Sequence, residues 1–438
     1  MLKGLAPLCL IGIAQEGLWL SLYSLGPLRQ NTTPFLIIVF AAFATCLWSF
    51  CRIRVSNGKS LFVLLSFALL FRLTVLPSPP YESEDVYRYL WDARVASSGV
   101  SPFQYPPEAP ELEKLRDSEL YPMINSKPYV TVYPPLSQIL FRAGFGMFGE
   151  NVVPMKAIFG MLEFLSLLVA WKLLASLGWR LESLFLMAWN PFFIFEFSHS
   201  GHSDSAAIFL VLLSVYLLHR SRRAPALVSF AGAVMSKLHP ALWFPLYLRR
   251  AGWKPALAGL TAGAALTFVY FTPATGWKYV NALRDYLRLF EFNAGIHYFF
   301  RYLGRVLYDQ SWDQLTGPYL AVSLLAVAVL IWWRFPSRDE VDLMHAGFWI
   351  MTADLCLATT VHPWYLSWAA LALPIFPYAF MLYWTCAVFL SYLAYQYRPV
   401  YEPTWVLLVE YLPMYALMVW EIRRGRPLLG TGDQTRRH

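Results

Sequence analysis

The stretch Glu82-Ser-Glu-Asp-Val-Tyr-Arg-Tyr-Leu-Trp-Asp-Ala-Arg94 follows closely on an apolar run at residues 60–76. The chain as a whole is 58% hydrophobic and only 14% charged. Helices that face lipid gain no stability from charges clustered just outside the membrane, so this cluster is a candidate for chemistry. The junction therefore predicts a membrane protein whose functional groups lie at the edge of the bilayer.

Further apolar runs of about 16–22 residues recur along the chain, each long enough to cross a hydrocarbon core of about 30 Å. A single soluble core would need far more charged surface than this composition supplies. We therefore predict an all-α fold, a polytopic bundle of about 12–14 transmembrane helices in one integral membrane domain, residues 1–438. The predicted spans are roughly 5–26, 34–50, 60–76, 134–149, 153–177, 182–198, 204–219, 225–248, 254–272, 317–334, 341–360, 364–379, 381–396 and 403–420.

Basic residues gather in short clusters between these spans, which is typical of cytoplasmic loops. The formal net charge of +8 therefore indicates no nucleic-acid partner. The same rule predicts that the loops 77–133 and 273–316 face outside. The rule does not settle the topology of the middle of the chain. An even number of predicted spans separates loop 77–133 from the basic cluster at 220–223, which would place that cluster outside. Either one middle segment does not cross, or that cluster breaks the rule.

The two outer loops are large enough to carry function. Loop 77–133 is rich in proline and holds nine acidic and five basic residues. Loop 273–316 combines arginines with aromatic residues, which predicts an amphipathic helix on the membrane surface. The five cysteines show no metal-ligand spacing, and neither a phosphate-binding glycine loop nor a serine nucleophile elbow is found. We expect no metal and no cofactor.

A helix over 84–97 would place Asp85, Arg88 and Asp92 on one face, opposite an apolar stripe. A carboxylate kept ionised by a neighbouring cation is what a general base requires. The alternative is a solvated helix face in which Arg88 pairs with Asp92 or with Glu84. The position between a membrane span and a proline-rich loop favours function.

Five more polar residues interrupt or flank apolar segments. His202 and Asp204 could bind phosphate or pair with each other, and Asp204 could simply cap the next helix. Lys237 and His239 lie inside segment 225–248, where a cation must face a partner or a cavity, and a lipid phosphate is a natural anion for it. His362 lies at the outer end of a span, where an aromatic belt explains its neighbours but not the histidine.

In this order, the motifs resemble those of glycosyltransferases of the GT-C fold that use a polyprenyl-phosphate sugar. The closest likeness is to the bacterial polyprenyl-phosphate-mannose-dependent mannosyltransferases, over about residues 60–380. The resembling motifs are Ser83-Glu84-Asp85-Val86-Tyr87-Arg88-Tyr89, Asp92-Ala93-Arg94, Ser101-Pro102-Phe103, Tyr133-Pro134-Pro135-Leu136, Asn190-Pro191, Gly201-His202-Ser203-Asp204, Lys237 with Pro240, and His362-Pro363-Trp364-Tyr365.

The resemblance implies a multi-pass protein of the plasma (inner) membrane with its active site on the extracytoplasmic side. It implies Asp85 as catalytic base, and Glu84 as the possible substitute, because many relatives carry a second aspartate there. It also implies a polyprenyl-phosphate sugar donor, with mannose as the sugar, and a lipid or glycan acceptor. The residues themselves fit glucose or another hexose equally well. The predicted donor-phosphate and substrate residues are Arg88, Asp92, His202, Asp204, Lys237, His239 and His362.

The mechanism expected from this is an inverting single displacement, in which Asp85 takes the proton of an acceptor hydroxyl and a lipid phosphate leaves. A flippase or secondary transporter for lipid-linked sugars is the alternative, with Lys237, His239 and Asp204 as translocation residues. A third possibility is a polymerase or ligase that uses diphosphate-linked sugars. The absence of two similar halves in the sequence disfavours the transporter.

Overall fold

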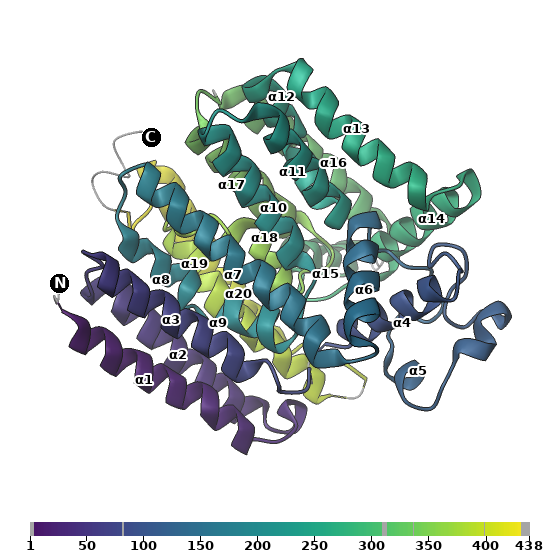
Figure 1. Ribbon diagram of the computed structural model, residues 1–438, viewed down its shortest axis with the longest axis horizontal. Helices are drawn as coiled ribbons and strands as arrows, with labels where there is room; N and C mark the ends of the chain where they lie inside the picture. The colour runs from purple at the N-terminus through teal and green to yellow at the C-terminus, as the bar shows by residue number, and fades with distance from the viewer. Residues whose placement is uncertain (1–3, 81–82, 309–312, 336, 398, 431–438) are drawn as a thin grey trace. The chain divides into compact units, whose positions relative to one another are not determined.

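The computed structural model describes residues 4–80, 83–308, 313–335, 337–397 and 399–430; Glu82, the first residue of the charged stretch, lies outside them. The all-α prediction is confirmed. The described residues form the helices α1 to α20, joined by short 3-10 and π turns, and they include no strand, only an isolated bridge between Phe292 and Thr360 (Figure 1).

The chain forms two compact units, and it passes from one to the other four times. Unit 1 consists of Met1–Glu82, Gly160–Ser200 and Pro363–His438. Unit 2 consists of Ser83–Phe159 and Gly201–His362. All the residues predicted to carry chemistry belong to unit 2.

Six helical segments of the described residues are long and apolar enough to cross a membrane: Leu5–Ser24, Thr32–Arg52, Gly58–Val75, Val152–Ser176, Thr316–Arg334 and Thr404–Arg424. A seventh span results if Trp253–Tyr270 (α13) and Pro273–Leu289 (α14), which meet at a bend of 101°, are counted together. The chain is therefore a multi-pass membrane protein, with fewer long continuous helices than the 12–14 predicted.

Several predicted spans are broken. Segment 182–198 consists of α8 (Phe185–Ala188), α9 (Pro191–Ile194) and a π turn. Segments 364–379 and 381–396 likewise contain only short helices and 3-10 turns, among them α18 (Ser367–Ala370) and α19 (Ala379–Ala387). Proline lacks the N–H group that a helix interior requires, so Pro191 in segment 182–198 and Pro374 and Pro377 in segment 364–379 favour such breaks. Segment 381–396 contains no proline, and its change from α-helix to 3-10 helix has no such cause.

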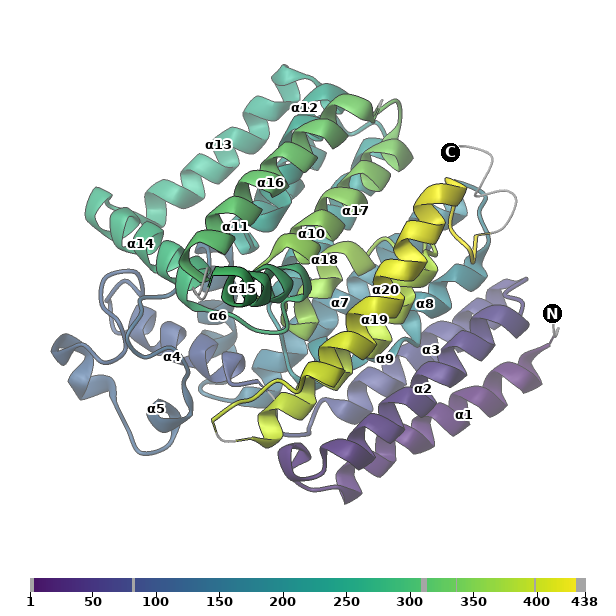
Figure 2. The same ribbon diagram turned by 180° about the vertical axis from the view of Figure 1, so that it is seen from behind.

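In unit 1, α1 (Leu5–Ser21), α2 (Thr32–Arg52) and α3 (Gly58–Val75) lie side by side (Figures 1 and 2). Arg72 of α3 forms a buried ion pair with Glu163, with 2.5 Å between Nε and Oε2. Arg72 also donates to the carbonyl oxygen of Ala188. Two buried charges that pair and share further hydrogen bonds offset much of their desolvation cost, so this pair can persist inside the apolar unit.

In unit 2, α10 packs on α11, α11 packs on α13, and α4 packs on α6. The interruption expected at Lys237 is confirmed, because α11 ends at Ser236 and a 3-10 turn begins at His239. The helices of this unit are α4 (Asp85–Ser97), α5 (Leu120–Met123), α6 (Pro135–Phe148), α10 (Asp204–His219), α11 (Arg223–Ser236), α12 (Phe244–Ala251), α13, α14, α15 (Gly295–Tyr308), α16 (Asp313–Arg334) and α17 (Glu340–Leu357).

Gly347 of α17 allows a close approach to the buried indole of Trp243. A Cβ atom at position 347 would overlap Trp243 Cε2. We expect Gly347→Ala to destabilise the protein by about 1–3 kcal/mol through overpacking. The control is Gly146→Ala on α6, where the added atom meets open space. Thermal unfolding in detergent measures both, and equal unfolding temperatures for the two variants would contradict the packing described.

Candidate active site

Asp85 is the first residue of α4, where the partial positive charge of the helix N-terminus favours a carboxylate. Its side chain is 17% exposed. Oδ1 accepts a hydrogen bond of 2.9 Å from Asn125 Nδ2, and Oδ2 lies 3.4 Å from His202 Nδ1. Each carboxylate oxygen thus has a contact that orients it, while part of the group stays open to a substrate.

These contacts keep the Asp85 carboxyl ionised. Burial by itself would raise the pKa of Asp85, but the contacts with His202 and Asn125 outweigh it and lower the pKa to about 2. Burial lowers the pKa of His202, against the opposing effect of Asp85. At neutral pH the pair is therefore a carboxylate beside a neutral imidazole, which satisfies the contact when it is protonated on Nδ1.

Gly201 sets the backbone turn that brings His202 to Asp85. Its φ angle is +77°, in the left-handed region that favours glycine, and an added Cβ would lie 2.6 Å from Lys156 Cγ. Glycine at 201 thus meets both a conformational and a packing requirement. His202 itself is fully buried, whereas its partner Asp85 is partly exposed.

His362 extends the same polar region. Burial lowers the pKa of His362 to about 4, with Asp85 opposing that shift through its charge. The imidazole stacks on the ring of Phe292, with 5.0 Å between centroids and 26° between planes. Phe292 is held in turn by a backbone hydrogen bond of 2.8 Å from Val361 N to its carbonyl oxygen. His362 is therefore a neutral, oriented side chain at neutral pH.

Lys237 and Asp204 form an ion pair of 3.1 Å between Nζ and Oδ2. Asp204 begins α10 and is buried, whereas the Lys237 side chain is 16% exposed and lies 5.8 Å from the centroid of the Tyr133 ring. The charges of Lys237 and Asp204 affect the pKa values of His202 and His362. The ion pair therefore belongs to the same polar region as Asp85 and the two histidines. The cation predicted to need a partner has a carboxylate partner.

His239 lies two residues beyond Lys237 but has a different partner. Its Nδ1 is 2.9 Å from Oδ2 of Asp354 on α17. The His239 side chain is 33% exposed, more than that of Asp354. The carboxylate holds the ring in a fixed orientation, with the partly exposed histidine as the member of the pair that a ligand can reach.

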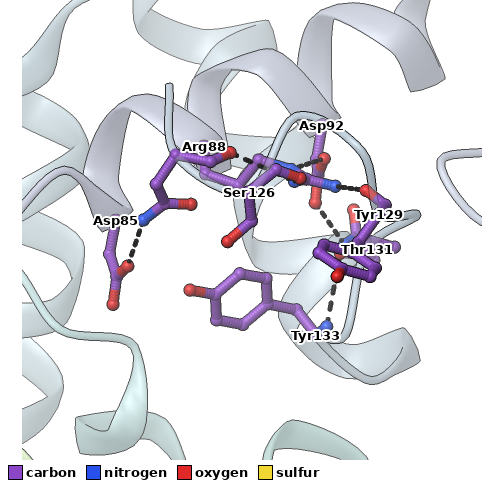
Figure 3. A network of polar contacts seen from close by, with 9 residues as sticks. Asp85, Arg88, Asp92, Ser126, Tyr129, Thr131 and Tyr133 are labelled. Atoms are coloured by element: carbon purple, nitrogen blue, oxygen red, sulfur yellow. Dashed lines mark hydrogen bonds and ion pairs between the residues drawn. The ribbon is translucent and has the colours of Figure 1, made fainter. Parts of the chain in front are cut away.

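Arg88 and Asp92 form a buried ion pair on α4, with 2.9 Å between Nε and Oδ1. Arg88 also donates to the carbonyl oxygens of Ser126 and Tyr129, at 3.1 and 3.0 Å. Figure 3 shows these contacts beside Asp85. The helix predicted at 84–97 is confirmed as α4, and the face predicted to carry Arg88 and Asp92 is covered by the 125–131 segment.

The predicted residues thus divide into four sets. Asp85, His202, Asp204, Lys237 and His362 form one polar cluster. Arg88 and Asp92 belong to the buried network beside it, and His239 pairs with Asp354. Glu84, the alternative base, is the exposed N-cap residue of α4.

Sequence reasoning missed three residues of this region. Asp354 lies inside the predicted span 341–360, and a charge inside an apolar segment needs a partner, so Asp354 carries the same sequence signal as Lys237. Asn125 and Phe292 carry no such signal, because each acts through a contact with a residue far away in the sequence. Within the described part of the chain, no group of three His, Cys, Asp or Glu side chains is placed to hold a metal ion.

Comparisons with known proteins identify the family of the chain. A family model described as "Alpha-(1->6)-mannopyranosyltransferase, N-terminal domain" matches residues 11–250, more than half of the chain. The chain is 23% identical over 352 residues to alpha-(1->6)-mannopyranosyltransferase A of Mycobacterium tuberculosis, an alignment covering 74% of this chain and 67% of that protein. No solved structure matches the chain. The family match includes Asp85, His202 and Lys237 and ends before His362.

Proposed function

The chain belongs to the alpha-(1->6)-mannopyranosyltransferase family and is a membrane mannosyltransferase, and on that basis we propose that Asp85 is its general base. The donor is mannose on a polyprenyl-phosphate carrier, and the acceptor is a hydroxyl group of a glycan or lipid. The observation that carries the proposal is the ionised, partly exposed Asp85 carboxylate, held on both oxygens within one cluster with the Lys237 cation.

Of the two members of the Asp85–His202 pair, Asp85 is the one that can meet the acceptor. His202 is fully buried, whereas Asp85 is partly exposed. The acceptor hydroxyl would donate its hydrogen bond to the carboxylate, attack the anomeric carbon of mannose, and lose its proton to Asp85 as the glycosidic bond forms. The bond from the anomeric carbon to the phosphate oxygen breaks, and the configuration at that carbon is inverted.

Lys237 is the cation suited to the departing phosphate. An ammonium group has three N–H donors, and its ion pair with Asp204 orients it without removing its charge. The charge that develops on the carrier phosphate as the bond breaks would be stabilised by this preorganised cation. His362 and His239 add oriented imidazole groups that can donate to phosphate or sugar oxygens.

The bound donor would also strengthen the base. A carboxyl with a pKa of about 2 is ionised at neutral pH but attracts a proton only weakly. A phosphate held near Lys237 brings a negative charge into the cluster, and a like charge raises the pKa of a carboxyl. Asp85 would therefore become a better proton acceptor when the donor is in place.

Labelled polyprenyl-phosphate mannose supplied to right-side-out and inverted membrane vesicles tests this function. We expect label in an α-(1→6)-linked product with release of carrier phosphate, from donor and acceptor on the extracytoplasmic face. Label that only changes sides, without a new glycosidic bond, would show a flippase instead. Transfer from a diphosphate-linked sugar alone would show a different leaving group. Either result would contradict the proposal.

We expect Lys237→Met to raise the KM for the donor about 10- to 100-fold, as loss of a charged hydrogen-bond donor costs about 1.5–3 kcal/mol. The matched control is Lys254→Met at the exposed start of α13. Initial rates of transfer at varied donor concentration measure the effect. An unchanged KM for the donor together with a normal rate would exclude Lys237 from the phosphate site.

A further inference from the structure

Asn125 lies in the non-helical segment between α5 and α6, and it is tied to α4 in two ways. Its side-chain amide donates to Asp85 Oδ1 at 2.9 Å. Its backbone carbonyl, at 3.5 Å, and that of Ser126, at 3.1 Å, accept from Arg88 Nη1. Ser126 has a φ angle of +52°, a backbone conformation that costs energy for a residue with a side chain. The contacts with Arg88 hold the segment in this strained form.

Arg88 is fixed from its other side by a second set of buried contacts. Asp92 accepts from Arg88 Nε, and its other oxygen accepts from Gln138 Nε2 at 3.0 Å. Gln138 also donates to Thr131 Oγ1 at 2.9 Å. Helix α4, helix α6 and the 125–131 segment are thus joined by one network, whose members come from three parts of the chain (Figure 3).

We infer that Asn125 is a positioning residue for the transfer reaction, and that the Arg88–Asp92–Gln138 network is the frame that holds it against Asp85. This rests on the proposed function, in which Asp85 is the base. Asn125 on one oxygen and His202 on the other fix the plane of the carboxylate. The acceptor hydroxyl then meets an oriented lone pair of an immobile carboxylate. Arg88 and Asp92 act on the site through this frame and touch no substrate.

The test compares Asn125→Asp, which keeps the shape but replaces the N–H donor, with Asn281→Asp on α14 as the matched control. We expect Asn125→Asp to lower kcat about 10- to 100-fold, the effect of losing a hydrogen bond to a charged group, with less than about a twofold change in the KM for the donor. Asn125→Gln, which retains the amide, should restore part of the rate. A loss shared equally by kcat and KM, without rescue, would indicate a merely structural role.

The pH profile gives a second measurement. A carboxylate at 125 would raise the pKa of Asp85, so the rate of Asn125→Asp relative to the parent should fall as the pH is lowered from 8 to 6. His202, His362 and Tyr89 also interact with Asp85, and Lys237 and Asp204 interact with His202. A ratio independent of pH would contradict the inference.

A double variant separates this inference from the proposed function. If Asn125 acts through Asp85, then Asp85→Asn with Asn125→Asp should be no slower than Asp85→Asn alone. Losses that multiply would overturn the positioning role while leaving Asp85 as the base. A near-normal rate for Asp85→Asn alone would overturn the proposed function and the inference together. Gel filtration in detergent confirms that each variant is folded.

Discussion

Asp85→Asn is expected to lower the rate of mannosyl transfer by about 10²–10⁴-fold, the range typical of a lost general base. The amide matches the carboxylate in shape and can still contact Asn125 and His202, but it cannot take a proton from the acceptor. The KM for the donor should not rise, because the proposed phosphate site is at Lys237 and the substitution removes a like charge from the same cluster. Transfer of labelled mannose by purified protein in liposomes measures both quantities.

Two further variants make this result specific. Glu84→Gln tests the neighbouring carboxylate. Glu84 is the exposed N-cap residue of α4, and we expect its substitution to have a much smaller effect than that of Asp85. Glu111→Gln, on the exposed surface of the same loop, controls for a change of loop charge. If Glu84→Gln shows the large loss and Asp85→Asn does not, the base has been assigned to the wrong residue.

Asp85→Asn also changes the folding stability of the protein, in a direction that depends on pH. The pKa of Asp85 lies below its ordinary value in the folded protein, at about 2. Its ionised form therefore stabilises the fold above the ordinary pKa of about 4, and this contribution is lost as the pH falls through the folded value. Asp85→Asn lacks the contribution at neutral pH, so rates should be compared at a temperature at which both proteins stay folded.

Arg88→Met is expected to destabilise the protein by about 3–5 kcal/mol, because it leaves the buried Asp92 carboxylate without its cation. The carbonyl groups of Ser126 and Tyr129 lose their donors as well. The expected result is a clear fall in the temperature of thermal unfolding in detergent. Such a loss would show that Arg88 holds the structure together, whatever its distance from the substrate.

The controls for Arg88 separate burial from charge. Arg284→Met removes the same group from an exposed pair with Asp285, and surface pairs are worth only about 0–1 kcal/mol. Arg88→Met combined with Asp92→Leu should cost less than Arg88→Met alone, since no unpaired carboxylate remains. If Arg88→Met and Arg284→Met unfold at the same temperature, the buried network is not a source of stability.

The sequence predicted the all-α class and the helix at 84–97, because apolar runs and a 3.6-residue periodicity are local signals. It did not predict the breaks in segments 182–198 and 364–379. Hydropathy counts apolar residues whether or not the backbone is continuous, so short helices separated by prolines were merged into single spans. The interruption at Lys237 could be predicted because a charged residue stands out in an apolar segment.

In the candidate site too, the residues with a local sequence signal could be predicted and their tertiary partners could not. Asp85, Lys237 and His362 could be singled out because ionisable residues stand out in an apolar sequence. Their partners could not, because pairing depends on the tertiary fold: Lys237 meets Asp204, and Arg88 turns inward to Asp92 and the 125–131 segment. Asn125 was missed because an isolated asparagine in a proline-rich loop is typical of a turn.

The repeated passage of the chain between the two units has a consequence for biosynthesis. The ribosome delivers Asp85 early, His202 more than a hundred residues later, and His362 only near the end. A nascent chain halted at residue 250, the limit of the family match, would still lack Asp354 and His362. The proposed catalytic centre is therefore completed only late in translation, and we expect a fragment that ends at residue 250 to be inactive.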